Sequence, residues 1–218
     1  TTVIVSHVWP LGGFGPDPGR EFNNLGILAV ECFFALSGFL ITRSGERLDT
    51  GRFLWHRMVR IFPGLWLALV FVALIAAPLV WRADHRLAEY PFAQPGPLGY
   101  LLNNALLQNG QQAIGDTLAG NPFPSMWNGP LYTLPFEFLC YLIVAGLVAF
   151  RILTPTMVAI ITAATWVWLQ ILEAGLLGVA DTRQARFTLM FFAGSLIYLH
   201  RDTLLRRDRW WLAALSAV

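Results

Sequence analysis

The chain has 218 residues, of which 56% are hydrophobic and only 13% are charged. A soluble domain carries about a quarter charged residues, so this composition argues against one and indicates a membrane protein with several spans. The net charge of +2, without a basic tract, argues against a nucleic-acid partner. Cys32 and Cys140 lie inside apolar runs and outside any metal-ligand spacing, which predicts small buried side chains, no zinc site and no disulfide framework.

Apolar runs predict an all-α fold, a polytopic bundle of transmembrane helices. Residues 1–9 are interpreted as the tail of a first span, and a seventh span is predicted to begin near residue 210. The complete spans between them are predicted at about 24–42, 64–81, 130–150, 155–173 and 186–200. Because the chain starts and stops within apolar runs, we expect residues 1–218 to be one membrane domain, truncated at both ends, with about six to seven spans.

The arginines predict which side of the membrane each connection faces. If the spans alternate in direction, ten arginines fall on one side and five on the other. The side with ten is expected to be cytoplasmic, because cytoplasmic loops carry an excess of basic residues. Segments 10–23 and 82–129 then face outward, and the second is predicted to include a short interfacial helix near 98–108.

The segment 51–63 has the pattern of an amphipathic helix on the cytoplasmic surface. One arc of its helical wheel is basic and the other is apolar, with Phe53 as the exception. Pro63 predicts either the end of this helix or a kink into the next span. The basic arc has two interpretations: arginines that meet lipid headgroups, or a clamp for an anion, because Arg binds phosphate bidentately. Its members are Arg52, His56, Arg57 and Arg60.

Three ionisable residues within the predicted spans stand out, because such groups are costly in a membrane and are therefore functional candidates. His7 lies near the outer end of the first span, and Glu31 lies about two turns into the second span from the same side. A carboxylate beside a histidine would fix its tautomer and stabilise the imidazolium, which suits a general base. The alternatives are a wet interfacial histidine, a structural hydrogen bond for Glu31 and, for Glu137, an ion pair with an arginine such as Arg183 or Arg186.

The dipeptide Ser37-Gly38 stands inside the second predicted span. Its LSGFL context lacks the GxSxG pattern of a nucleophilic serine. Small residues within a span instead predict a close helix-packing step.

Four motifs follow one another along the chain, after His7. They are VECFFALSGFLIT (30–42), RFLWHRMVRIFP (52–63), GPLYTLPFEFLCYL (129–142) and RFTLMFFAGSLIYL (186–199). The first resembles the V-[D/E]-x-F-F-x-x-S-G-F-L-I signature of the acyltransferase type 3 family of integral membrane O-acyltransferases. The others are similar to that family's R-F-x-x-x-R-x-x-R-[I/L]-x-P, [W/Y]-[S/T]-L-x-x-E-x-x-x-Y and R-F-x-x-x-F-x-x-G elements, so the resemblance covers essentially the whole chain.

The resemblance implies an enzyme of the bacterial cytoplasmic (inner) membrane, with about ten spans in the complete domain. It would transfer an acyl group, usually acetyl, from cytoplasmic acyl-CoA to a hydroxyl of a carbohydrate or glycoconjugate acceptor, without a metal. Matched residue by residue, His7 is the catalytic histidine and Glu31 its acidic partner. Arg57 and Arg60, with Arg52 beside them, match the basic pair that is expected to bind acyl-CoA.

The resemblance also implies a polar network that binds substrate or supports the fold. Its members match Tyr132, Glu137 and Arg186. His7 would act either as a general base or through an acyl-histidine intermediate.

Two other classes of function fit the same residues. A proton-coupled transporter or flippase of a polar lipid would use His7 and Glu31 as a proton relay. A non-enzymatic scaffold would tolerate replacement of both.

Overall fold

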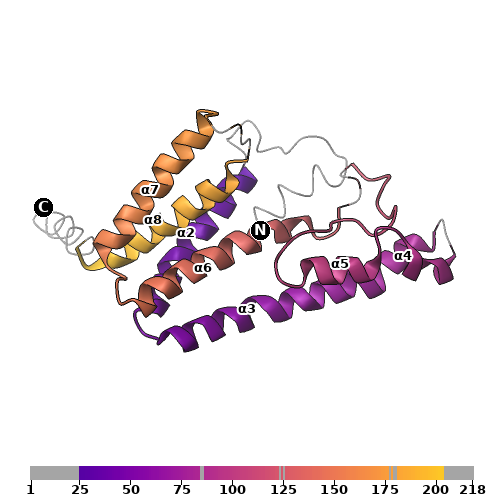
Figure 1. The fold of residues 1–218 in the computed structure, drawn as a ribbon, viewed down its shortest axis with the longest axis horizontal. Coiled ribbons are helices and arrows are strands. Elements are labelled where there is room, and N and C mark those ends of the chain that lie inside the picture. The colour runs from indigo at the N-terminus through magenta and orange to yellow at the C-terminus, as the bar shows by residue number, and fades with distance from the viewer. Residues whose placement is uncertain are drawn as a thin grey trace, which may run out of the picture. The chain divides into compact units, whose positions relative to one another are not determined.

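The computed structural model describes residues 25–83, 86–122, 124, 126–176, 178 and 181–203, and every regular element in that part of the chain is helical (Figure 1). The predicted first span with His7 and the predicted seventh span lie outside the described residues. The elements are α2 (Leu25–Gly45), α3 (Thr50–Phe71), the π-helical turn η2 (Val72–Ala76), α4 (Ala77–Trp81), the 3-10 helix η3 (Leu87–Phe92), α5 (Pro97–Asn104), the 3-10 helix η4 (Gly129–Thr133), α6 (Leu134–Ala149), α7 (Pro155–Glu173) and α8 (Arg183–Leu199).

Four helical stretches in the described residues are long and apolar enough to cross a membrane. They are Gly26–Gly45, Thr50–Trp81, Gly129–Ala149 and Pro155–Glu173, and they confirm the spans predicted from residues 24, 64, 130 and 155 onward. The helix predicted at 186–200 is also present as α8, but its 17 residues make it shorter than these four. The predicted helix near 98–108 is confirmed as α5.

Of the two alternatives predicted for Pro63, the end of the helix is wrong, and the helix continues into the next span. Residues 50–81 form one continuous helical stretch, and Pro63 lies inside α3. Proline removes one backbone hydrogen bond, a loss that membrane helices tolerate. The irregular turn comes later, at η2, where the Ala77 N–H donates to the Val72 carbonyl. The Tyr90 hydroxyl donates to the Ala73 carbonyl in this turn over 2.6 Å, so a side chain of η3 supplies a donor where the α-helical pattern is interrupted.

The described residues form two compact units. The first comprises residues 25–28 and 55–138, and the second comprises residues 29–54 and 139–203. The first unit is therefore built on most of α3 and the long segment that follows α4. The second contains most of α2 and α6 together with α7 and α8.

In the first unit, the segment after α4 folds back onto the end of the long helix. The Trp81 ring meets the Tyr90 ring edge to face at 6.0 Å between centroids, and its indole N–H donates to the Arg86 carbonyl over 3.2 Å. Gly115 lies against Trp81 with φ of +55°, a position that leaves no room for a side chain. Nearer the middle of α3, the Trp66 indole N–H donates to the Ala105 carbonyl over 2.9 Å.

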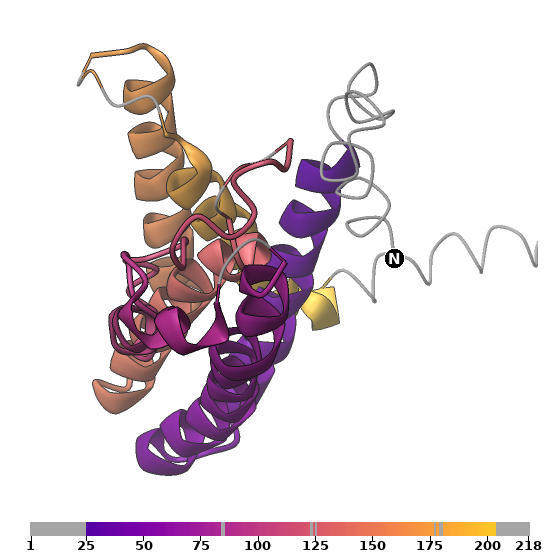
Figure 2. The same ribbon diagram turned by 90° about the vertical axis from the view of Figure 1, so that its right-hand side faces the viewer.

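In the second unit, α7 and α8 lie side by side as an antiparallel pair (Figures 1 and 2). Leu169 and Leu172 of α7 pack with Ala185 and Leu189 of α8. Helix α8 also packs against α2, as described for the site below. The side chain of Thr154 caps the start of α7 by accepting from a backbone N–H two residues into the helix.

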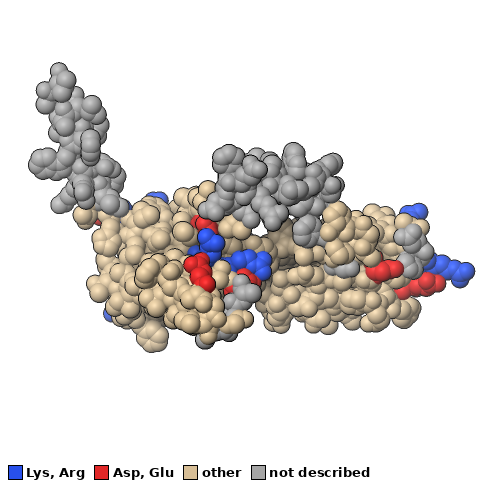
Figure 3. All heavy atoms as spheres, turned by 90° about the horizontal axis from the view of Figure 1, so that it is seen from above, with Lys and Arg blue, Asp and Glu red and all other residues tan. Residues whose placement is uncertain are grey.

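Large apolar side chains cover much of the exposed surface. Trp55 is 64% exposed, Leu67 72% and Trp166 54%. Figure 3 shows a face on which charged residues are few. Exposed apolar helix faces are expected where lipid, rather than water, surrounds the protein.

The same reason corrects one prediction about the cysteines. Cys140 is buried as predicted, but Cys32 is exposed. An apolar run in a membrane span faces lipid as well as protein, so the run alone does not fix which residues are covered.

Candidate functional site

The α2–α8 contact depends on two glycines. A side chain at Gly38 would overlap the carbonyl group of Phe191, and one at Gly194 would overlap the carbonyl group of Ala35. The predicted packing step at Ser37-Gly38 is therefore confirmed. The Ser195 hydroxyl contributes a hydrogen bond to the Gly38 carbonyl over 3.3 Å.

The two helices run parallel. Glu31 faces Arg186, Phe34 stacks on Phe187, and Phe39 meets Tyr198, so the residue numbers rise together along both helices. The predicted spans 24–42 and 186–200 are the second and sixth, and strict alternation across a membrane requires these two to run in the same direction.

Glu31 forms an ion pair with Arg186 at this contact. The Arg186 Nε atom lies 3.2 Å from the Glu31 Oε1 atom. Glu31 is 7% exposed, and no hydrogen bond from a described residue reaches its Oε1 atom. One residue further along α8, the Phe187 ring stacks on Phe34 with centroids 4.8 Å apart. The carboxylate is thus buried, its charge is balanced by Arg186, and its Oε1 atom can accept a further hydrogen bond.

A second acid–arginine contact joins the other ends of α2 and α8. The Tyr198 hydroxyl donates to the Glu46 Oε2 atom over 2.7 Å, and an Arg201 Nη1 atom lies 3.8 Å from the same oxygen. The Arg201 guanidinium also lies 4.1 Å from the centroid of the Tyr198 ring. Sequence reasoning did not single out these residues, because they stand at the ends of apolar runs, where charged residues are common.

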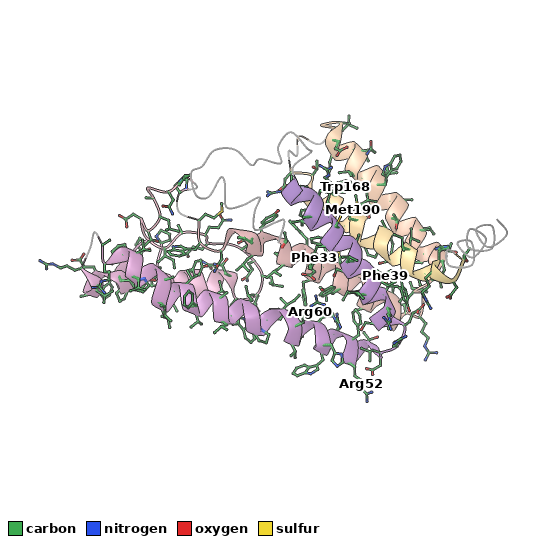
Figure 4. The ribbon with its side chains drawn as sticks, turned by 180° about the vertical axis from the view of Figure 1, so that it is seen from behind. Phe33, Phe39, Arg52, Arg60, Trp168 and Met190 are labelled. Carbon is green, nitrogen blue, oxygen red and sulfur yellow. The ribbon has the colours of Figure 1, made fainter. Side chains whose placement is uncertain are left out.

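The arginines predicted to bind an anion lie on α3 in different surroundings. Arg52 is exposed at the start of the helix (Figure 4). Its Nε atom lies 3.4 Å from the Asp49 Oδ2 atom, and its backbone N–H donates to the Asp49 Oδ1 atom over 3.0 Å. That backbone hydrogen bond from Arg52, the largest cause, holds the pKa of Asp49 below its usual range. Arg57 is partly buried and Arg60 is exposed. Of the three arginines, Arg52 thus has Asp49 as its partner at the start of the helix.

Glu137 and Tyr132 lie at the start of the fourth predicted span. Glu137 is 5% exposed in the first turn of α6, where the positive end of the helix dipole favours a carboxylate. Tyr132 lies in η4, immediately before α6. The two arginines considered as partners of Glu137 have contacts elsewhere. Arg186 pairs with Glu31, and Arg183 forms two hydrogen bonds with the side chain of Asp181.

The segment after α4 contains a hollow of about 310 Å³. Trp81 forms part of its wall, and Asp116, Thr117 and Asn121 contribute polar groups to its lining. Thr117 is held in place on both sides, since its hydroxyl donates to the Ile114 carbonyl over 2.5 Å and accepts from the indole N–H of Trp127 over 2.9 Å. A concave site with polar groups of this kind is suited to a ligand that carries hydroxyls.

Comparisons with known proteins agree with these features. A family described as an acyltransferase domain, acyltransferase 3, matches residues 1–218. The chain belongs to the acyltransferase 3 family. A curated relative, named O-acetyl transferase, from Shigella phage Sf6, is 33% identical over 149 residues. The match covers 67% of this chain and 42% of the relative, so the chain spans less than half the length of that relative. No solved structure matches the chain.

Membership of the acyltransferase 3 family confirms the resemblance that the motifs predicted. Together with the all-helical fold and its four candidate spans, it makes the chain part of a multi-pass membrane protein of the acyltransferase 3 family.

Proposed function

We propose that the chain is the membrane domain of an O-acetyltransferase that transfers an acetyl group from cytoplasmic acetyl-CoA to a hydroxyl of a carbohydrate or glycoconjugate. The family match over residues 1–218 carries this proposal, and the name of the phage relative supports the acetyl group. The same relative comes from a phage of a bacterium, which supports a place in the bacterial inner membrane.

In this proposal His7 is the general base and Glu31 is its acidic partner. His7 takes the proton of the acceptor hydroxyl, and the oxygen attacks the carbonyl carbon of the thioester. The new ester C–O bond forms, the C–S bond breaks, and the coenzyme A sulfur leaves with the proton returned by the imidazolium. Positioned base catalysis of this kind contributes on the order of 10²- to 10⁴-fold in rate. The buried Oε1 atom of Glu31 supports the role, because it can accept an imidazole N–H.

Arg57 and Arg60, with Arg52 beside them, are proposed to bind the phosphates of acyl-CoA. Guanidinium groups bind phosphate bidentately, and the three residues follow one another on α3. Tyr132, Glu137 and Arg186 are proposed as a polar network that supports the site. The hollow beside Trp81 is a candidate for the acceptor, because its polar lining suits hydroxyl groups.

The test uses the full-length gene product and its His7→Ala variant, expressed in a bacterial host. Mass spectrometry of the cell-envelope glycans and of secreted sugars should find acetyl esters with the wild type and none with the variant, while both proteins are detected in the membrane. Esters that persist with His7→Ala would overturn the role of His7. If proton-coupled flux of a polar lipid is found instead, without acetyl esters, the protein is a transporter.

A further inference from the structure

The two acid–arginine contacts between α2 and α8 have the same spacing on both helices. Glu31 on α2 and Glu46 just after it are 15 residues apart, as are Arg186 on α8 and Arg201 just after it. This distance is about four helical turns, so both pairs fall on the same line of contact. The glycine contact at Gly38 lies between them.

The two pairs differ in their surroundings. The Glu31 side chain is 9% exposed and lies 3.2 Å from its arginine, whereas the Glu46 side chain is 37% exposed and lies 3.8 Å from its arginine. Glu46 also accepts a hydrogen bond from Tyr198, while no described residue gives one to the Oε1 atom of Glu31. A half-exposed pair is screened, and a buried carboxylate depends far more on its counter-charge.

The register of α2 on α8 does not require the Glu31–Arg186 pair. The glycine contact, the stacked Phe34 and Phe187 rings and the hydrogen bond from Ser195 to Gly38 already set it. The contacts of Glu46 with Tyr198 and Arg201 set the same register at the other ends of the two helices. Only the carboxylate of this pair is buried, since the Arg186 side chain is 42% exposed, and an ion pair with a buried member is in general weak support for stability.

We propose that Arg186 is a positioning residue of the acyltransferase site: it holds the Glu31 carboxylate in a fixed position on α2, whereas the matching Glu46–Arg201 pair serves only the helix contact. This proposal rests on the proposed function, because it takes Glu31 as the partner of the catalytic base. It predicts that Arg186 affects the chemical step through Glu31 and leaves acyl-CoA binding unchanged.

The experiment compares two charge exchanges in the full-length protein in membranes. The exchange E31R/R186E keeps an ion pair between the helices but moves the carboxylate from α2 to α8. The exchange E46R/R201E does the same at the other end and is the matched control. The readouts are the midpoint of thermal unfolding and the kcat and KM for acetyl-CoA, followed by release of free coenzyme A in membranes of cells that make the acceptor.

We expect Arg186→Gln to lower kcat by about tenfold or more, with KM for acetyl-CoA unchanged, and Arg186→Lys to recover part of that loss. The exchange E31R/R186E should keep an unfolding midpoint close to that of the wild type and still lack turnover. The control exchange E46R/R201E should keep both its midpoint and its turnover.

Recovered turnover in E31R/R186E would overturn the proposal, because the pair would then be purely structural, and so would an unchanged kcat in Arg186→Gln. Failure of the underlying function looks different. A wild-type protein that releases no coenzyme A would reject the acyltransferase itself, and a fully active Glu31→Gln variant would reject the role of Glu31.

Discussion

At the scale of single residues, the α2–α8 contact depends on two glycines, which have no side chain to hold the helices apart. Gly38 and Gly194 leave no side chain between the helices, and each helix backbone reaches the carbonyl groups of the other. Close backbone approach of this kind replaces the hydrophobic effect as a source of helix association within a membrane. It also fixes where Glu31 meets Arg186, because the contact tolerates no sliding.

Replacing Gly194 with alanine should therefore destabilise the protein. The added methyl group would overlap the Ala35 carbonyl, and overpacking of this kind costs about 1–3 kcal/mol. The measurement is thermal unfolding of the full-length protein in detergent. The matched control is Gly146→Ala in α6, where nothing lies within 4 Å of the new methyl group, and which should be neutral or stabilising by up to about 1 kcal/mol. Equal midpoints for the two variants would contradict the role of the contact.

Tyr90 gives a prediction about pH. Burial raises its pKa to about 12, compared with about 10 for an exposed tyrosine. Since the folded-state pKa is raised, the stability it contributes is fully present below about pH 10 and is lost as the pH rises through about 12. Titration of phenolate absorbance should show a late-ionising component near pH 12 that is smaller by one tyrosine in Tyr90→Phe. A Tyr90→Phe variant that keeps the same late titration would contradict the assignment.

At the scale of elements, the long helix of residues 50–81 shows what the sequence could and could not predict. Its apolar second half was predicted as a span, because apolar runs of that length fit a bilayer. Its continuity through Pro63 was only one of two alternatives, since proline usually ends helices in water and the membrane environment removes much of that penalty. The interruption at η2 comes just before Pro78, whose ring crowds the carbonyl four residues earlier, and the Tyr90 hydroxyl from a later segment donates to a carbonyl within it.

The same helix carries the proposed acyl-CoA arginines. Replacing both Arg57 and Arg60 with alanine should raise the KM for acetyl-CoA by about tenfold or more, because hydrogen bonds to charged groups contribute about 1.5–3 kcal/mol each. The kcat at saturating acetyl-CoA should change little. Arg47→Ala, which removes an exposed arginine from the connection before α3, is the control for loss of charge alone. An unchanged KM in the double variant would leave these arginines as contacts for lipid headgroups.

At the scale of the whole molecule, the sequence predicted more of the fold than of the site. Apolar length and arginine bias are local properties, so the helix positions followed from them. The partner of Glu31 could not be predicted in this way. Arg186 is distant in sequence, and helix packing decides which acid it pairs with. The prediction that Cys32 is buried was wrong for a related reason, since an apolar side chain can face either lipid or protein.

The arginine bias predicts which ends of the helices face the cytoplasm. A cysteine at Gly120, in the segment 82–129, should react with a membrane-impermeant maleimide on intact cells. A cysteine at Phe150, which is 77% exposed at the other end of the span Gly129–Ala149, should react only after permeabilisation. Both tests need a background in which Cys32 and Cys140 are replaced. The reverse pattern would place the proposed acyl-CoA arginines on the outer side and reject a cytoplasmic donor.

The proposed function requires that the protein transfer an acetyl group from acetyl-CoA to a hydroxyl. The most direct measurement supplies isotope-labelled acetyl-CoA to inside-out membrane vesicles that contain the full-length protein and its acceptor glycans. We predict that labelled acetyl esters form on the glycans as free coenzyme A is released in equal amount, and that neither occurs with His7→Ala. Esters without label, or coenzyme A released at the same rate by the His7→Ala variant, would contradict it.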